Sequence, residues 1–128
     1  MKKGYVKKLI LADIFTEGAE KFVKKLREQT SAEIVVCQAD ASSTESVVAI
    51  LTDVDVLLYA RIPEYNFKVM QACLDTKTHD IDMASDGPDS LLQQLDWDGK
   101  FKQAGIVGIM GLGCDLGFSN VAARYAAD

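Results

Sequence analysis

Short apolar runs alternate along the chain with amphipathic stretches, and this alternation limits the possible folds more than any other feature of the sequence. Apolar runs of strand length predict five strands, over residues 9–12, 34–37, 54–59, 80–83 and 106–110. Apolar residues at helical spacing predict helices over residues 17–29, 64–76, 98–104 and 118–127. Strands joined by helices imply a parallel sheet covered on both faces. The predicted fold is therefore α/β, a Rossmann-like doubly wound and mostly parallel sheet.

Local signals set several of the element ends. Ser42, with Glu45 three residues later, has the spacing of a capping box and predicts a short helix that runs to Leu51. Pro63 starts the helix after the third strand, at a position where a missing N–H costs nothing. Gly105 ends the helix over 98–104 as a C-terminal cap. Residues 90–95 predict only a weak helical turn or loop.

Charge and cysteine content exclude several classes of protein. The 128 residues carry a formal net charge of −5, so the chain lacks the counterion release that drives nucleic-acid binding. No apolar run approaches the ~18 residues of a membrane span, and no leader-like segment follows Met1. Three widely spaced cysteines, Cys37, Cys73 and Cys114, predict reduced thiols in a cytoplasmic protein, each a small buried side chain. The single histidine, His79, cannot complete a zinc site with them, and we expect it to play a structural role at the start of a strand.

The residues that follow the predicted strands are the candidates for function, because ligands of parallel sheets bind beyond the carboxyl ends of the strands. The carboxylate of Asp13 has the position to accept the hydroxyl groups of an adenosine ribose, or else it caps the next helix. Asp40 has the position to accept from an adenine amino group, although a helix-capping role is favoured. The loop that leads to Pro63 would lie beside the phosphates of a cofactor.

A glycine-rich loop, residues 111–117, joins the fifth strand to the last helix. Its pattern, G-x-G-x-x-x-G, is one residue longer than the Rossmann fingerprint. The fingerprint opens a βαβ unit with an acidic residue about 20 positions further on, but only eleven residues follow Gly117. Asp115, inside the loop, would also repel a pyrophosphate. We therefore interpret the loop as something other than a phosphate-binding fingerprint.

Taken together, these segments resemble the dinucleotide-binding domain of the saccharopine dehydrogenase family. The resemblance covers essentially all 128 residues and rests on Ala12–Asp13, Gln38–Ala41, Asp53–Leu58, His79–Ala84 and Gly111–Asn120. The family includes saccharopine reductases, carboxynorspermidine dehydrogenases and homospermidine synthases. Its members use NADH or NADPH to reduce an imine formed between an amine and a carbonyl compound.

The resemblance implies a set of cofactor-binding residues. Asp13 would meet the adenosine ribose, and Asp40 and Ala41 would lie near the adenine. Ala60 and Pro63 would flank the phosphates and the nicotinamide. Gly113, Asp115 and Gly117 would lie near the nicotinamide. No catalytic acid or base and no metal ligand is expected within the chain.

The chain also departs from the family pattern. Leu116 stands where the family usually has proline, and Arg61 and Ile62 replace a small or apolar residue and a proline. Ile14 and Phe15 follow Asp13, where NADP-preferring enzymes offer arginine, so NAD is slightly favoured over NADP. The opening strand with its G-x-G-x-x-G loop is not found. We therefore expect residues 1–128 to be a partial NAD(P)-binding Rossmann-like domain, without its first βα unit and without a C-terminal substrate domain.

Two functions remain open at this point. The first is a cofactor-domain fragment of an NAD(P)-dependent oxidoreductase acting on C–N bonds, which alone would bind a dinucleotide weakly or not at all. The alternative is a non-enzymatic α/β module that associates with a missing domain, or with itself as a homodimer, through its incomplete sheet. A receiver-like domain is disfavoured, because Met110 is followed by Gly111 and not by lysine.

Overall fold

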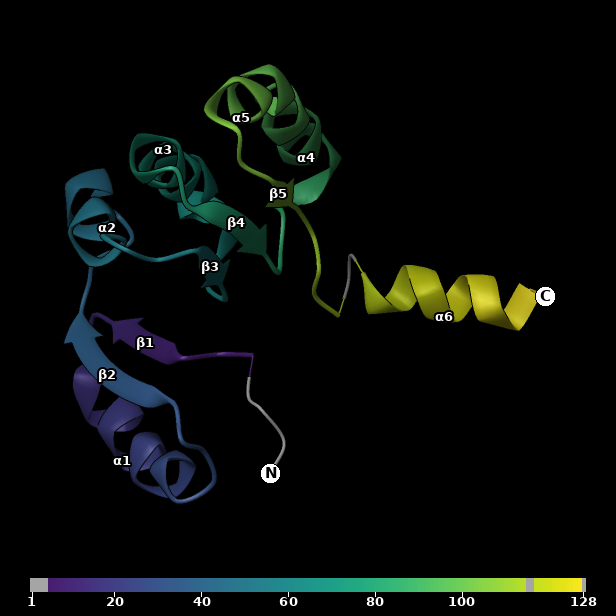
Figure 1. The fold of residues 1–128 in the computed structure, drawn as a ribbon. Helices are drawn as coiled ribbons and strands as arrows, with labels where there is room; N and C mark the ends of the chain where they lie inside the picture. The colour runs from purple at the N-terminus through teal and green to yellow at the C-terminus, as the bar shows by residue number, and fades with distance from the viewer. Residues whose placement is uncertain (1–4, 115–116, 128) are drawn as a thin grey trace. The chain divides into compact units, whose positions relative to one another are not determined.

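The computed structural model of the chain describes residues 5–114 and 117–127. The chain divides into two compact units, Met1–Asp40 and Ala41–Asp128, and Figure 1 shows their helices and strands. Within the described residues, no helix combines the length and the apolar character needed to cross a bilayer.

The first unit is a single β–α–β motif. Strand β1 (Lys8–Asp13) pairs in parallel with β2 (Glu33–Gln38), and helix α1 (Thr16–Arg27) connects them. Val23 of α1 is fully buried. Phe22, which shares the predicted apolar stripe, is 59% exposed. The two strands and the helix that the sequence predicts here are confirmed, with ends shifted by one or two residues.

The second unit contains a three-stranded parallel sheet in the order β3-β4-β5. Its strands are β3 (Val56–Tyr59), β4 (His79–Asp82) and β5 (Gly108–Ile109). Its helices are α2 (Thr44–Ile50), the 3-10 turn η1 (Pro63–Tyr65), α3 (Asn66–Thr76), α4 (Gly87–Leu95), α5 (Asp98–Ala104) and α6 (Phe118–Ala127). The parallel α/β class is confirmed, but the five strands form two sheets and not one. Apolar periodicity locates strands, whereas the choice of neighbour depends on backbone pairing that periodicity does not specify.

One face of the three-stranded sheet carries the core of the second unit. Tyr59 of β3 packs there with α3 residues that include Met70 and Cys73, and with Phe101 of α5. Alternate residues of the same sheet point the other way, and Leu58 and Ile109 are 58% and 43% exposed. This alternation follows from the two-residue period of a strand. The side chains of Asp80 and Asp82, at alternate positions of β4, therefore face the helices.

Several local predictions are corrected. The N-cap of α2 is Ser43, whose Oγ accepts the Ser46 N–H at 3.2 Å, so Ser42 is not the cap. Residues Gly87–Leu95 form a regular helix, with Pro88 in its first turn, where only a weak turn was predicted. Gly105 caps α5 in the left-handed conformation, with φ of 73°, as predicted.

The cysteines differ in exposure more than the sequence indicates. Cys73 is completely buried, and burial raises the pKa of its thiol. Cys37 is half-buried, and the pKa of its thiol is likewise raised by burial. Cys114 is exposed on the glycine-rich loop, so the prediction that every cysteine is a small buried side chain is wrong there.

Candidate functional site

Asp13 and Asp40 both lie at the carboxyl edge of the first unit. Asp13 is the last residue of β1, and its backbone oxygen accepts the Ala39 N–H at 3.1 Å. Asp40 directly follows Ala39, so both acids lie where the parallel strands end. This is the edge at which α/β sheets bind ligands.

Asp13 also organises the turn that leads into α1. Its Oδ1 accepts the Phe15 N–H at 3.0 Å, a turn in which an aspartate binds the backbone two residues on. The Gln38 side chain donates to the Ile14 carbonyl at 3.1 Å and holds the same turn. The N-cap position of α1 belongs to Phe15, so Asp13 shapes the approach to the helix without being its cap.

The helix-capping interpretation of Asp40 is wrong. The next helix, α2, takes its cap from Ser43. The role of Asp40 as an acceptor for an adenine amino group stays a prediction. Ala41, the first residue of the second unit, packs against the core of that unit.

The carboxyl edge of the second unit is formed by the segments that leave β3, β4 and β5. After β3, the Tyr59 hydroxyl donates to the Ile62 carbonyl at 3.0 Å and fixes the loop that contains the exposed Ala60. Pro63 then begins η1, which leads into α3, so its predicted place at a helix start is confirmed.

Asp82, at the end of β4, holds this edge together. Its side chain is buried, and its Oδ1 accepts the Gly111 N–H at 2.7 Å. Its Oδ2 accepts from the Gln94 side chain at 2.8 Å and from the Asn66 side chain at 3.4 Å. The backbone oxygen of Asp82 accepts the Leu112 N–H at 2.9 Å. One carboxylate therefore links β4 to α3, to α4 and to the glycine-rich loop.

The sequence reasoning missed Asp82, although a signal was present. Strands of parallel sheets read as continuous apolar runs because both faces are covered. The segment His79–Asp82 instead places two acids at alternate positions, Asp80 and Asp82, on one face of the strand. Two acids on a face that must be covered by helices point to buried carboxylates with partners.

The glycine-rich loop is tightly packed, and its carbonyl oxygens accept hydrogen bonds from the first N–H groups of α6. A Cβ added to Gly113 would overlap the Met83 carbonyl, and one added to Gly117 would lie 2.5 Å from the Gly113 oxygen. The N–H of Phe118 donates to Gly113 and the N–H of Ser119 donates to Cys114, both at 2.9 Å. The first donors of α6 are therefore occupied within the loop, which agrees with the interpretation that it is not a phosphate cradle. Asp115 lies outside the described residues.

His79 has the structural role that was predicted for it. It begins β4, and its Nδ1 accepts the Val107 N–H at 3.0 Å. In the described part of the chain, no cluster of three or more His, Cys, Asp or Glu residues has the arrangement of a metal site.

The predicted cofactor residues thus fall into two sets. Asp13 and Asp40 lie on the first unit. Ala41, Ala60, Pro63, Gly113 and Gly117 lie on the second, with all but Ala41 in the segments that follow β3 and β5. Their proposed contacts with a dinucleotide stay predictions.

Comparison with known proteins gives one family. The family model described as the saccharopine dehydrogenase NADP binding domain matches residues 2–109. Carboxynorspermidine synthase of Vibrio cholerae is 31% identical over 124 residues, an alignment that covers 84% of this chain and 30% of that protein. Carboxyaminopropylagmatine dehydrogenase of a Synechocystis strain is 29% identical over 103 residues, covering 75% of this chain and 26% of that protein. The chain therefore spans less than a third of the length of these relatives.

A solved structure shows the same fold. The apo form of saccharopine dehydrogenase (L-Glu forming) from Saccharomyces cerevisiae superposes with a TM-score of 0.70 at 17% identity. The match covers 93% of this chain and 24% of that chain. It supports the Rossmann-like α/β architecture.

Proposed function

The chain belongs to the saccharopine dehydrogenase family through its NADP-binding domain, and from that premise we propose that it is the dinucleotide-binding part of an oxidoreductase acting on C–N bonds. The family match over residues 2–109 is the observation that carries the proposal. The relatives named above are a synthase of carboxynorspermidine and a dehydrogenase of carboxyaminopropylagmatine. The proposed reaction class is reduction of an imine, of the saccharopine or carboxynorspermidine type.

The residues at the strand ends fit a dinucleotide chemically. A carboxylate is an acceptor-only group, so Asp13 at the end of β1 suits the two hydroxyl groups of a ribose. When bound, a reduced nicotinamide supplies the hydride, and the protein supplies binding, orientation and electrostatics. Asp13 would fix the adenosine ribose of the cofactor.

The preference between NAD and NADP rests on Asp13. The description of the family model names NADP. Asp13 is followed by Ile14 and Phe15, and its carboxylate would repel the 2′-phosphate of NADP. NAD therefore remains the predicted preference, and a direct comparison of the two cofactors tests it.

We also propose that residues 1–128 are one part of a longer NAD(P)-binding protein. The chain spans 30% of the Vibrio cholerae relative. The groups that grip the phosphates, bind the substrate and transfer protons would then lie in the remaining length. On this proposal the chain alone binds a dinucleotide weakly, and nanomolar to low-micromolar affinity would contradict it.

Association with another polypeptide is a second proposal, supported by the sheets. Within the described residues, β1 pairs only with β2, and β3 pairs only with β4, so each has one edge without a strand. The open edge of a sheet presents unpaired N–H and C=O groups with which a strand of another chain can pair. A missing domain or a second copy of the chain would fill them, and a monomeric mass in light scattering together with a cooperative melt would argue against either.

The cofactor proposal is tested by titrating the labelled chain with NADH and with NADPH and following the backbone amide signals. We expect shifts at Asp13, Asp40 and Ala41, and in the loops after β3 and β5, at millimolar cofactor. The variant Asp13→Asn should weaken the response to NADH. Glu20→Gln, on the exposed side of α1, removes one carboxylate from the same unit and should leave it unchanged. Equal responses of the two variants, or shifts remote from the strand ends, would refute the assignment.

A further inference from the structure

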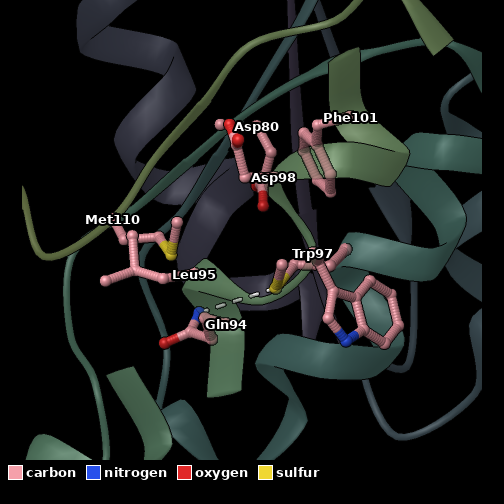
Figure 2. Close-up of a pocket in the computed structure, with 9 residues that line it drawn as sticks. Asp80, Gln94, Leu95, Trp97, Asp98, Phe101 and Met110 are labelled. Atoms are coloured by element: carbon pink, nitrogen blue, oxygen red, sulfur yellow. Dashed lines mark hydrogen bonds between the residues drawn. The ribbon is translucent and has the colours of Figure 1, made fainter. Parts of the chain in front are cut away.

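The three-stranded sheet of the second unit turns one of its faces to the interior. A cavity of about 150 Å³ lies between this face and the helices α4 and α5. Figure 2 shows the residues that line the cavity, among which Asp80, Gln94 and Phe101 are buried. Side chains that alternate with Asp80 along the strands point to the other face of the sheet.

That other face is apolar and largely exposed. Leu58, Ile81 and Ile109 lie side by side across β3, β4 and β5. Val56 and Val107 extend the same face, because each lies two residues before one of them. All of these residues except Ile81 are 43% to 58% exposed. We call these five side chains the exposed face. Parallel sheets occur almost only with both faces covered, so the exposed face requires a partner.

Helix α6 carries an apolar stripe without a surface to pack on. Phe118, Val121 and Tyr125 recur at helical spacing and are 69%, 66% and 85% exposed. Of the residues of α6 that the structure describes, none is buried. A helix of 10 residues is marginal in water unless its apolar side packs against another element. These three side chains, the α6 stripe, therefore require a surface.

The exposed face and the α6 stripe match each other in size. The stripe is about 10 Å long, at ~1.5 Å per residue from Phe118 to Tyr125. The face is about 10 Å wide across its three strands, because neighbouring strands lie ~4.8 Å apart. Both sets are exposed in a single chain, whereas two copies can cover both. Their exposed parts amount to on the order of 800 Å² per chain, which is about what each partner of a stable complex buries.

We propose that the exposed face binds α6 of a second copy of the chain, and that two copies dock their α6 helices reciprocally. Such a dimer is closed and has two-fold symmetry, which is the commonest arrangement of protein oligomers. The inference rests on the association proposed above and deepens it, because it names the partner and a surface other than the sheet edges. No residue of the exposed face or of the α6 stripe belongs to the set proposed for the dinucleotide.

The test follows the molar mass of the full 128-residue chain by sedimentation equilibrium, from micromolar to millimolar concentration. We expect the mass to double within this range. No residue of the two sets is charged, and each copy carries a formal net charge of −5. Salt screens the repulsion between the copies, so dimerisation should hold or strengthen as the salt concentration rises.

Two variants change the two sides of the contact. Leu58→Lys places a charge on the exposed face, and Tyr125→Lys places one on the α6 stripe. Each should weaken dimerisation at least tenfold, because an unpaired charge resists burial in an apolar contact. Both residues are exposed in the single chain, so neither change should prevent folding. Phe22→Lys, at a residue of α1 that is 59% exposed, is the matched control and should dimerise as the unmodified chain does.

A mixture of the two variants distinguishes reciprocal docking from the stacking of two sheets. The mixed dimer of Leu58→Lys with Tyr125→Lys retains one intact contact, between α6 of the first variant and the exposed face of the second. It should therefore form at a lower concentration than either variant needs to dimerise alone. In a mixture of isotope-labelled and unlabelled unmodified chains, a nuclear Overhauser contact should join Ile109 of one copy to Tyr125 of the other.

Each other outcome would overturn the inference. A monomer throughout the concentration range refutes it, while the dinucleotide proposal is decided separately by the titration with NADH. A dimer that resists both variants refutes the exposed face as the contact and leaves association through the sheet edges. A contact between Ile109 and Tyr125 within one copy would place α6 on its own sheet. A mixture that dimerises no better than the single variants would refute the reciprocal arrangement.

Discussion

The Oδ1 atom of Asp82 accepts the backbone N–H of Gly111 at 2.7 Å, which ties the end of β4 to the glycine-rich loop after β5. The other oxygen of the same carboxylate accepts from Gln94 of α4 at 2.8 Å. Asp82 is 2% exposed, so water cannot replace its side chain as the acceptor of either hydrogen bond. The geometry of the strand-end loops on the second unit therefore depends on one buried acid.

Replacing this acid should destabilise the fold. Asp82→Ala leaves the Gly111 N–H and the Gln94 amide without an acceptor, and each unsatisfied buried donor costs about 1–3 kcal/mol. We expect the free energy of unfolding, measured with urea, to fall by about 2–4 kcal/mol. Asp75→Ala, on the exposed side of α3, should change it by no more than about 0.5 kcal/mol. A loss of similar size in both variants would contradict the anchoring role of Asp82.

Gly113 should tolerate no side chain. An added Cβ would overlap the backbone oxygen of Met83, which has no flexible end that could move aside. Gly113→Ala should therefore cost about 2 kcal/mol or more in urea unfolding and shift amide signals at Met83. Gly99, within α5, has no atom within 4 Å of an added Cβ. Gly99→Ala serves as the matched control and should stabilise the chain by up to about 1 kcal/mol. A neutral Gly113→Ala would show that the loop relaxes away from β4.

The local spacing of apolar residues predicted the helices and strands well. It failed where the outcome depended on contacts between residues far apart in the sequence. The helix over 118–127 is found as predicted, because its apolar spacing and the preceding Gly117 are both local signals. The division into two sheets was not foreseen, since strand neighbours are chosen by pairing over long distances. Likewise, the rule about strand ends located Asp13 and Asp40, whereas Asp82 and Gln94 meet only when β4 and α4 pack together.

The prediction of the α2 N-cap is wrong by one residue. The spacing of Ser42 and Glu45 predicts a capping box, but α2 begins at Thr44 and so uses Ser43. Ser43→Ala removes the acceptor of the Ser46 N–H and should lower the free energy of unfolding by about 1 kcal/mol. Ser43→Asn, which keeps a good capping oxygen, should restore most of it. If Ser43→Ala is neutral in urea unfolding, the cap contributes little to stability.

Asp80 should make the stability of the chain depend on pH in a direction opposite to that of a paired carboxylate. Burial, reinforced by the charge of Asp82, raises its pKa to about 7 in the folded chain, against ~3.9 when unfolded. The folded chain therefore holds this proton more tightly than the unfolded chain does. The stabilisation this gives is complete below about pH 4 and is lost as the pH rises through about 7.

Asp80→Asn removes the titrating group and retains its shape, so it isolates this contribution. We expect the free energy of unfolding of the unmodified chain to fall, relative to that of Asp80→Asn, between about pH 4 and about pH 7. A shift of about three pKa units corresponds to about 4 kcal/mol, which is the upper limit of the difference. Urea unfolding at a series of pH values measures it, and Asp75→Asn should reproduce the slope of the unmodified chain. Parallel curves for the unmodified chain and Asp80→Asn would show that Asp80 ionises normally in the fold.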